Sequence, residues 1–328
     1  MRKLLVLALL ISIASISLLS VLSNMLVGYP ERLPADQEQP NYDKEKMPPK
    51  LLFMVSPPTP KLFWSISTAD YYSGFNWLRT TYEKTLEELP TAPFTNATTV
   101  FSVEINMTQQ EILLPTASPD SALANISSSP LEDLRSRVDS VGNVYEVIRN
   151  GEGEEIKLLY EVSWRDIDIG DSLASNETVP EEIQNRYLQL PSISAEVWES
   201  ARELEDPSYS ILDQVLADIQ FLRTNFVYDL ELAQSYWRVQ TSGAQGSDVS
   251  SFMRSRKGVC IDAATALAVI LRIQGIPARI CFGFKPESIQ GGKLLYYSSG
   301  AHALTEVYVS PYGWVRFDAT PHWKRRLF

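Results

Sequence analysis

The chain has little of the two side chains that most often bind transition metals. Its 328 residues include two cysteines and two histidines, so we expect neither a metal site nor a bound cofactor. Positive charge is also scarce, with 29 lysine and arginine residues against 40 aspartate and glutamate residues, a net charge of −11 and a pI near 4.8. Because phosphate binding needs clustered positive charge, this balance argues against a nucleic-acid partner.

The N-terminus carries an apolar segment. Arg2 and Lys3 precede an uninterrupted run of apolar and small residues at 4–22. At 1.5 Å per residue this run is about long enough to cross a hydrocarbon core of ~30 Å. Residues 1–28 are therefore predicted to be a membrane anchor with its N-terminus inside, and a cleaved signal peptide is the alternative. In both cases the rest of the protein lies outside the cytoplasm, anchored or secreted.

Two further segments are predicted to lie outside the folded parts. Residues 29–50 place prolines among charges and are typical of an extended linker. Residues 323–328 are expected to form a basic, solvated tail, or to flank a further membrane segment. Four Asn-x-Ser/Thr sequons fit an exported and glycosylated surface. They begin at Asn96, Asn106, Asn125 and Asn176.

Residues 258–275 (GVCIDAATALAVILRIQG) are predicted to be a helix that begins at a cysteine. Its small and apolar residues recur at three- and four-residue spacing as one buried stripe, and Gly275 and Pro277 end it. A thiol in the first turn meets unpaired N–H groups and the positive end of the helix dipole, and both favour the thiolate. Cys260 is therefore a candidate nucleophile. Cys281, on an alternating strand, is its one possible disulfide partner, and we expect a buried thiol there instead.

Two later segments add an imidazole and a carboxylate. Residues 301–309 alternate as a strand that presents His302 from a rigid element. After a turn signal at 310–313, a second strand presents Asp318. A thiolate that attacks an acyl carbon needs an imidazole to take and return the proton, and a carboxylate to orient the imidazole.

The register of this hairpin is open. If 310–313 is a simple four-residue loop, His302 faces Pro321 and Asp318 faces Thr305. A bulge, a longer turn or a diagonal contact must then bring His302 and Asp318 together.

Four segments occur in one order along the chain: GVC at 258–260, LRIQGIPARICFGF at 271–284, HALTEVYV at 302–309 and GWVRFDATP at 313–321. Together they resemble the transglutaminase-like superfamily, a papain-like group with a Cys-His-Asp triad. The resemblance implies Cys260 as nucleophile, His302 as general base and acid, and Asp318 as the orienting carboxylate. The family usually has Trp two residues after the His, where this sequence has Leu304, and this departure concerns substrate preference.

An α+β fold is predicted in three folded parts. A β-rich domain is expected at 51–170, a connecting helical segment at 171–206, and at 207–322 a papain-like core of helices followed by an antiparallel sheet. The alternating residues at 101–107 and 156–164 predict two strands of the β-rich domain.

Turn signals add further expectations. Asn150-Gly151 predicts a hairpin turn, and the Ser- and Asn-containing segment at 115–130 predicts a loop. In the core, Asp206 and Pro207 are expected to begin a helix.

Further site residues are expected around the cysteine. An oxyanion hole needs the Cys260 backbone N–H and one side-chain donor, for which Trp237 and Tyr228 are both candidates. Leu304 is expected in the substrate cleft. Glu306 is expected either to make a polar contact there or to have a surface or structural role.

The leading functional prediction is an extracytoplasmic cysteine acyltransferase that acts on a Gln carboxamide or a peptide bond through a thioester. The alternatives are a papain-like protease or cell-wall endopeptidase, and a non-catalytic module that binds a surface polymer or partner protein. The expected substrate is a protein or a cell-envelope polymer. No residue decides between crosslinking and hydrolysis, or fixes the oligomeric state.

Overall fold

The computed structural model describes residues 49–59, 63–81, 83–86, 99–139, 144–150, 155–164, 178–229, 232 and 247–321. The expected anchor, nearly all of the linker, the tail, and the sequons at Asn96 and Asn176 lie outside these residues. Within the described ranges, no helix combines the length and the apolar character that a bilayer crossing requires.

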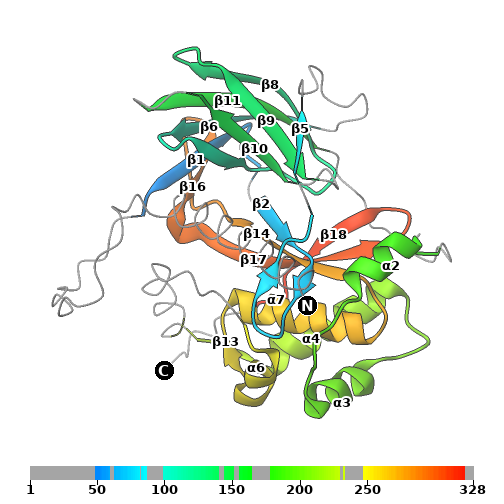
Figure 1. The fold of residues 1–328 in the computed structure, drawn as a ribbon. Helices are drawn as coiled ribbons and strands as arrows, with labels where there is room; N and C mark the ends of the chain where they lie inside the picture. Colours follow the sequence, from blue (N-terminus) through cyan, green and yellow to red (C-terminus); the bar gives the residue numbers. More distant parts are fainter. Residues whose placement is uncertain are drawn as a thin grey trace, which may run out of the picture.

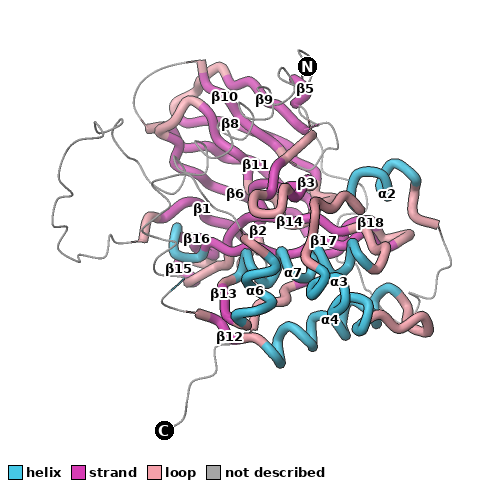
Figure 2. The backbone as a smooth tube through the Cα atoms, turned by 60° about the horizontal axis from the view of Figure 1, so that its bottom comes forward, coloured by secondary structure: helices cyan, strands magenta, loops and turns pink. Residues whose placement is uncertain are grey.

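Three layers stack in the molecule (Figure 1). Strands of a β-rich part lie at one end, a four-stranded sheet lies in the middle, and helices cover the far face of the middle sheet. Figure 2 shows the same separation from another side, with the helices gathered on one side of the strands. The predicted α+β class is confirmed.

The β-rich part contains two antiparallel sheets. The larger is hydrogen-bonded in the order β15, β16, β1, β6, β11, β8. Its strands are β1 (Leu51–Ser56), β6 (Thr99–Met107), β8 (Ala122–Ser129), β11 (Ile156–Trp164), β15 (Ser288–Gln290) and β16 (Lys293–Tyr297). The smaller has the order β5, β9, β10, β7. Its strands are β5 (Glu83–Leu86), β7 (Glu111–Leu114), β9 (Leu134–Asp139) and β10 (Tyr145–Arg149).

Strong alternation identified the central strands of the larger sheet correctly. The segments predicted as strands at 101–107 and 156–164 form β6 and β11, which pair from Ile156 and Met107 to Trp164 and Thr99. One face of each strand is buried in the core of the β-rich part, because period-two alternation places most of the apolar side chains on that face.

Two turn and loop predictions were wrong. The strands β10 and β11 that flank Asn150-Gly151 belong to different sheets, so this dipeptide does not connect a hairpin. The segment 115–130 contains β8, which pairs with β11 at the edge of the larger sheet. An edge strand can carry polar side chains such as Ser127 because its outer side faces solvent, and its composition then resembles that of a loop.

The middle sheet has the order β18, β17, β14, β2. Its strands are β2 (Trp64–Ala69), β14 (Ala278–Phe284), β17 (Ala301–Val309) and β18 (Gly313–Phe317). Helix α7 (Cys260–Ile273) packs on β17 and β14, and the Thr305 hydroxyl donates to the Ala264 carbonyl at 3.0 Å. Around α7 lie α3 (Ala195–Leu204), α4 (Ile211–Asn225) and α6 (Val249–Ser255), while α2 (Glu181–Tyr187) lies beside the sheet (Figure 1).

Helix α4 begins later than predicted. Asp206 and Pro207 precede a turn, and the helix begins at Ile211 after Ser210. The Ser210 hydroxyl accepts from the Asp213 N–H at 3.1 Å, and the Asp213 carboxylate accepts from the Ser210 N–H at 3.3 Å. This reciprocal capping box supplies partners for both backbone donors and determines where the helix begins.

The middle sheet and the largest sheet exchange strands across the expected domain boundaries. Strand β2 comes from the N-terminal half but pairs with β14 in the middle sheet. Strands β15 and β16 come from the C-terminal half but extend the larger β-rich sheet, where β16 pairs with β1. Each sheet is therefore completed by chain from the other half.

Candidate functional site

The structure brings Cys260, His302 and Asp318 together. His302 Nε2 and Asp318 Oδ2 are 3.0 Å apart, and the His302 ring and the Cys260 sulfur share a hydrogen bond. Since Nε2 is occupied by Asp318, Nδ1 is the ring nitrogen left for the sulfur. Cys260, His302 and Asp318, which follow one another in this order along the chain, are thus also linked in this order by hydrogen bonds.

Cys260 is the first residue of helix α7, as predicted. Its sulfur also accepts from the backbone N–H groups of Ile261 and Ala303. Burial opposes the thiolate, but the hydrogen bond and charge of His302 together with these two N–H groups outweigh burial and lower the pKa of Cys260. The thiolate is therefore present at a pH where an ordinary thiol is protonated.

The imidazole is shifted in the opposite direction. Burial disfavours the charged ring, but hydrogen bonds to Asp318 and Cys260 and the negative charges of both raise the pKa of His302 to about 9. Burial likewise works against the Asp318 carboxylate, yet His302, Lys285 and Thr320 hold its pKa well below its usual range. Below about pH 9 the imidazole is therefore charged, beside an ionised carboxylate and a thiol whose pKa is lowered.

The hairpin register explains how His302 reaches Asp318. Val309 pairs with Gly313, so the loop has three residues rather than four, and Gly313 has a φ of 78°. In this register Asp318 is aligned two residues away from the position opposite His302, and the contact is diagonal. A diagonal pair on one face of a sheet is within reach of a long or cyclic side chain. The structure thus selects one of the three possibilities that the sequence left open.

An aromatic ring from the N-terminal half packs beside the imidazole. The Phe63 ring meets the His302 ring edge-on, with centroids 6.2 Å apart. Gly283, directly opposite His302 on β14, makes room for it, because a Cβ on Gly283 would lie 2.8 Å from the Phe63 ring and 1.9 Å from the Trp64 carbonyl oxygen. This contact could not be predicted, since no local pattern connects Phe63 to a strand more than 200 residues later.

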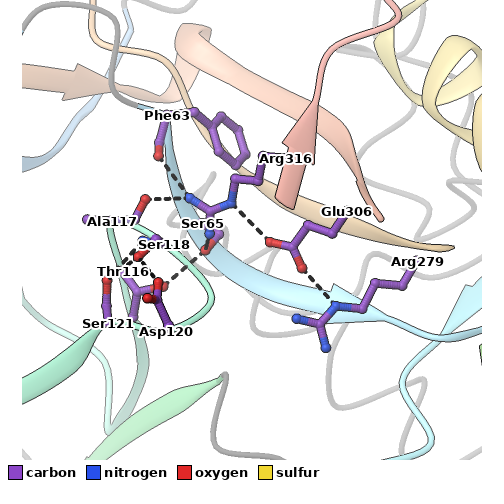
Figure 3. A network of polar contacts seen from close by, with 10 residues as sticks. All are labelled: Phe63, Ser65, Thr116, Ala117, Ser118, Asp120, Ser121, Arg279, Glu306 and Arg316. Carbon is purple, nitrogen blue, oxygen red and sulfur yellow. Dashed lines mark hydrogen bonds and ion pairs between the residues drawn. The ribbon is translucent and has the colours of Figure 1, made fainter. Parts of the chain in front are cut away.

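A buried ionic network lies on the same face of the sheet (Figure 3). Glu306 accepts from Arg279 Nε at 2.7 Å and from Arg316 Nε at 3.0 Å. The Arg316 guanidinium also donates to the carbonyl of Phe63 at 3.2 Å and to that of Ala117 at 2.6 Å. Since Asp318 follows Arg316 by two residues, the network ties the strand that leads to the carboxylate to both halves of the chain.

Two residues expected in the substrate cleft lie in the interior instead. Leu304 is buried in a small cluster with Phe63 and Cys281. Glu306 is fully buried between its two arginines, so of the roles left open for it the structure supports the structural one. Both side chains lie on the face of β17 opposite α7, where Phe63 packs against Leu304.

The two oxyanion candidates have different outcomes. Trp237 lies outside the described residues. Tyr228 lies on β12 (Val227–Tyr228) and pairs with Gly258 of β13 (Lys257–Gly258), two residues before Cys260. Burial, together with the negative charges of Cys260 and Asp262, raises the pKa of Tyr228 to about 12, so its hydroxyl keeps its proton.

Both cysteines are free thiols. Cys281 is fully buried and pairs across the sheet with Leu304, so it lies on the face away from α7. In the part of the chain that the structure describes, no group of three or more His, Cys, Asp or Glu side chains is placed to hold a metal ion.

Comparison with known proteins agrees with this geometry. Residues 199–319 match the Transglutaminase-like superfamily. These residues thus resemble a transglutaminase-like domain. The matched residues include Cys260, His302 and Asp318.

Two curated relatives share parts of this region. The chain is 30% identical to the uncharacterized protein YebA of Bacillus subtilis over 145 residues, and this stretch is 42% of this chain and 19% of that protein. It is 37% identical over 81 residues to the protein-glutamine gamma-glutamyltransferase of Pseudomonas aeruginosa, which covers 24% of this chain and 12% of that protein. The matches thus span less than a fifth of the length of either relative.

A solved structure shares the fold over a longer stretch. The periplasmic domain of TgpA from Pseudomonas aeruginosa superposes with a TM-score of 0.56 at 21% identity, covering 83% of this chain and 90% of that domain. The superposed 83% of the chain is a much longer stretch than residues 199–319, so the shared fold includes much of the β-rich part as well.

Proposed function

We propose that this protein is a cysteine acyltransferase of the transglutaminase type that acts outside the cytoplasm. The observation that carries the proposal is the hydrogen-bonded chain of Cys260, His302 and Asp318, in which the lowered thiol pKa and the raised imidazole pKa both favour a charged nucleophile and its acid. A thiolate beside a proton donor is the arrangement that acyl transfer through a thioester requires.

In the proposed reaction Cys260 Sγ attacks the carbonyl carbon of a Gln carboxamide in a protein or cell-envelope polymer. The His302 imidazolium gives its proton to the departing nitrogen, so ammonia leaves and a thioester remains. An amine or water then attacks the thioester carbon, and His302 takes the proton of this nucleophile as the thiolate leaves. Asp318 orients the ring and stabilises its charged form in both steps.

Tyr228 is the proposed side-chain donor to the oxyanion. It lies beside the segment that leads to Cys260, and it keeps its proton over the pH range where the thiolate exists. The backbone N–H of Cys260 would supply the second donor, as the first residue of a helix has an N–H without an intrahelical partner.

The relatives support the reaction type and the compartment. One is named a protein-glutamine gamma-glutamyltransferase, and the solved structure with the same fold is a periplasmic domain. The proposed location also rests on the apolar segment at 4–22, which would anchor the protein through residues 1–28.

The test supplies a Gln-containing protein and a fluorescent primary amine, and measures ammonia release and incorporation of the amine. Wild type is expected to release ammonia and label the acceptor protein, and Cys260→Ala is expected to do neither. Cys281→Ala is the matched control, since this thiol faces away from α7, and it should retain activity if it folds. New N-termini without ammonia would identify a peptidase, and no Cys260-dependent product would favour a binding module.

A further inference from the structure

The Asp318 carboxylate holds two positive groups on one oxygen. Its Oδ2 accepts from His302 Nε2 at 3.0 Å and from Lys285 Nζ at 2.8 Å. The other oxygen, Oδ1, accepts from the Thr320 N–H at 2.9 Å. The oxygen that supports the imidazole is therefore shared with an ammonium group, and the two cationic nitrogens lie within about 6 Å of each other because both bind it.

The backbone of Lys285 is fixed relative to His302. Lys285 follows the last residue of β14, and its N–H donates to the Gly300 carbonyl at 2.9 Å. The two backbones approach so closely that a Cβ on Gly300 would lie 2.4 Å from the Lys285 carbonyl oxygen. Gly300 precedes His302 by two residues, so the lysine is held beside the imidazole by main-chain contacts, although 48% of its side chain is exposed.

We propose that Lys285 is a positioning residue that holds Asp318 in place and limits the support that this carboxylate gives to the charged imidazole of His302. The inference rests on the proposed function for its catalytic consequence, but the ion pair that carries it is independent of any substrate. A hydrogen-bond acceptor that is shared by two cations stabilises each of them less than it would stabilise one alone.

Among the described residues, Lys285 competes with His302 for the Asp318 carboxylate. The other charged or titratable groups that contact this cluster include Cys260 on α7, Arg223 on α4 and Glu287 in the segment after β14. Arg223 donates to the backbone carbonyl of Asp318 and so does not compete for the carboxylate oxygen that binds His302. Phe63, which packs edge-on against the His302 ring, is uncharged.

The competition between Lys285 and His302 for the Asp318 carboxylate would favour acyl transfer. His302 must give its proton to the leaving nitrogen, and a ring that is held too strongly in its charged form is a weaker acid at a given pH. With Asp318 and Cys260 the pKa of His302 is already raised to about 9. By placing a positive charge near the ring, Lys285 keeps this pKa closer to the working pH.

The test measures the protonation of His302 directly. The chain has two histidines, His302 and His322, so the full-length protein with ¹³C-labelled histidine gives two ring signals, and His322→Gln assigns them. The His302 signal is followed against pH in wild type, Lys285→Met and Lys285→Arg. Loss of a charge at about 6 Å in a half-exposed site predicts an upward shift of about half to one pH unit in Lys285→Met. Lys285→Arg keeps the charge and should titrate near wild type.

An unchanged or lower midpoint in Lys285→Met would overturn the proposal, as would an equal shift in Lys285→Arg. If Lys285→Met does not fold, Lys285→Gln applies the same test with a polar side chain. In the acyl-transfer assay the uncharged variant is expected to lower kcat near neutral pH with KM unchanged. Absence of acyl transfer in wild type would remove the proposed function but not the NMR result, so the two failures are distinguishable.

Discussion

The substitution Glu306→Gln tests whether the buried ionic network stabilises the site. Glu306 is fully buried and bonds Arg279 Nε at 2.7 Å and Arg316 Nε at 3.0 Å. Gln keeps the volume and one acceptor oxygen but removes the negative charge, which leaves two buried or half-buried guanidinium groups uncompensated. Removal of one partner from a buried ion pair costs roughly 3 to 5 kcal/mol, and we expect about 3 kcal/mol because one oxygen remains.

The pH dependence of this loss follows from the pKa of Glu306. Burial works against the carboxylate, but Arg279 and Arg316 outweigh burial and lower the pKa below its unfolded value. A lowered carboxyl pKa stabilises the fold fully above the unfolded pKa of about 4.3, and this contribution disappears as the pH falls through the folded pKa. The difference between wild type and Glu306→Gln should therefore be largest near neutral pH and shrink below about pH 4.

Urea unfolding followed by circular dichroism measures the loss. For a chain of this size about 3 kcal/mol moves the midpoint by roughly 1 M urea. The matched control is Glu104→Gln, whose carboxylate pairs with Lys157 and Lys293, both of which have partly exposed side chains. Although Glu104 itself is buried, both lysines reach solvent and can be hydrated when the carboxylate charge is removed, so the control should lose much less. Equal losses in the two variants, or a Glu306→Gln midpoint equal to wild type, would refute this reasoning.

Three further outcomes are expected. Gly283→Ala should destabilise the protein or leave it insoluble, because the new Cβ would lie 1.9 Å from the Trp64 carbonyl oxygen, and a wild-type unfolding midpoint would contradict this close approach. Tyr228→Phe should lower kcat by roughly 10²-fold if its hydroxyl binds the oxyanion, while iodoacetamide alkylation of Cys260 continues at the wild-type rate; a wild-type kcat would remove that role. Because His302 lowers the pKa of Cys260, alkylation of Cys260 should remain fast well below pH ~8.5, and a rate that falls there like that of an ordinary thiol would show that no ion pair forms.

Local patterns predicted the elements that carry the triad. The helix that begins at Cys260 and ends before Gly275, and the strand at 301–309 with His302, both match their predicted positions, because each has a strong period and clear end signals. The hairpin register was left open, since it depends on whether the loop has three or four residues, and the positive φ of Gly313 decides this point.

Contacts between distant segments could not be predicted in the same way. Phe63 reaches His302 through the pairing of β2 with β14, and neither segment carries a local signal that names its partner. Lys285 was missed because it follows the end of a strand, where an exposed lysine is normally a solvated charge. Glu306 was correctly placed on the face of His302, but Arg279, Arg316 and Phe63 pack on that face, so an expected cleft residue is an interior ion pair.

The exchange of strands between the two sheets affects how the chain can fold as it is made. The larger sheet receives β16 only after residue 297 has been synthesised, although β1, its neighbour, begins at residue 51. Until then the edge of β1 that pairs with β16 has no partner strand, and the N-terminal half stays incompletely folded. Chains that pair over such separations close their contacts slowly and expose aggregation-prone edges. This delay is a reason to expect that chaperones bind the emerging half before the last strands are made.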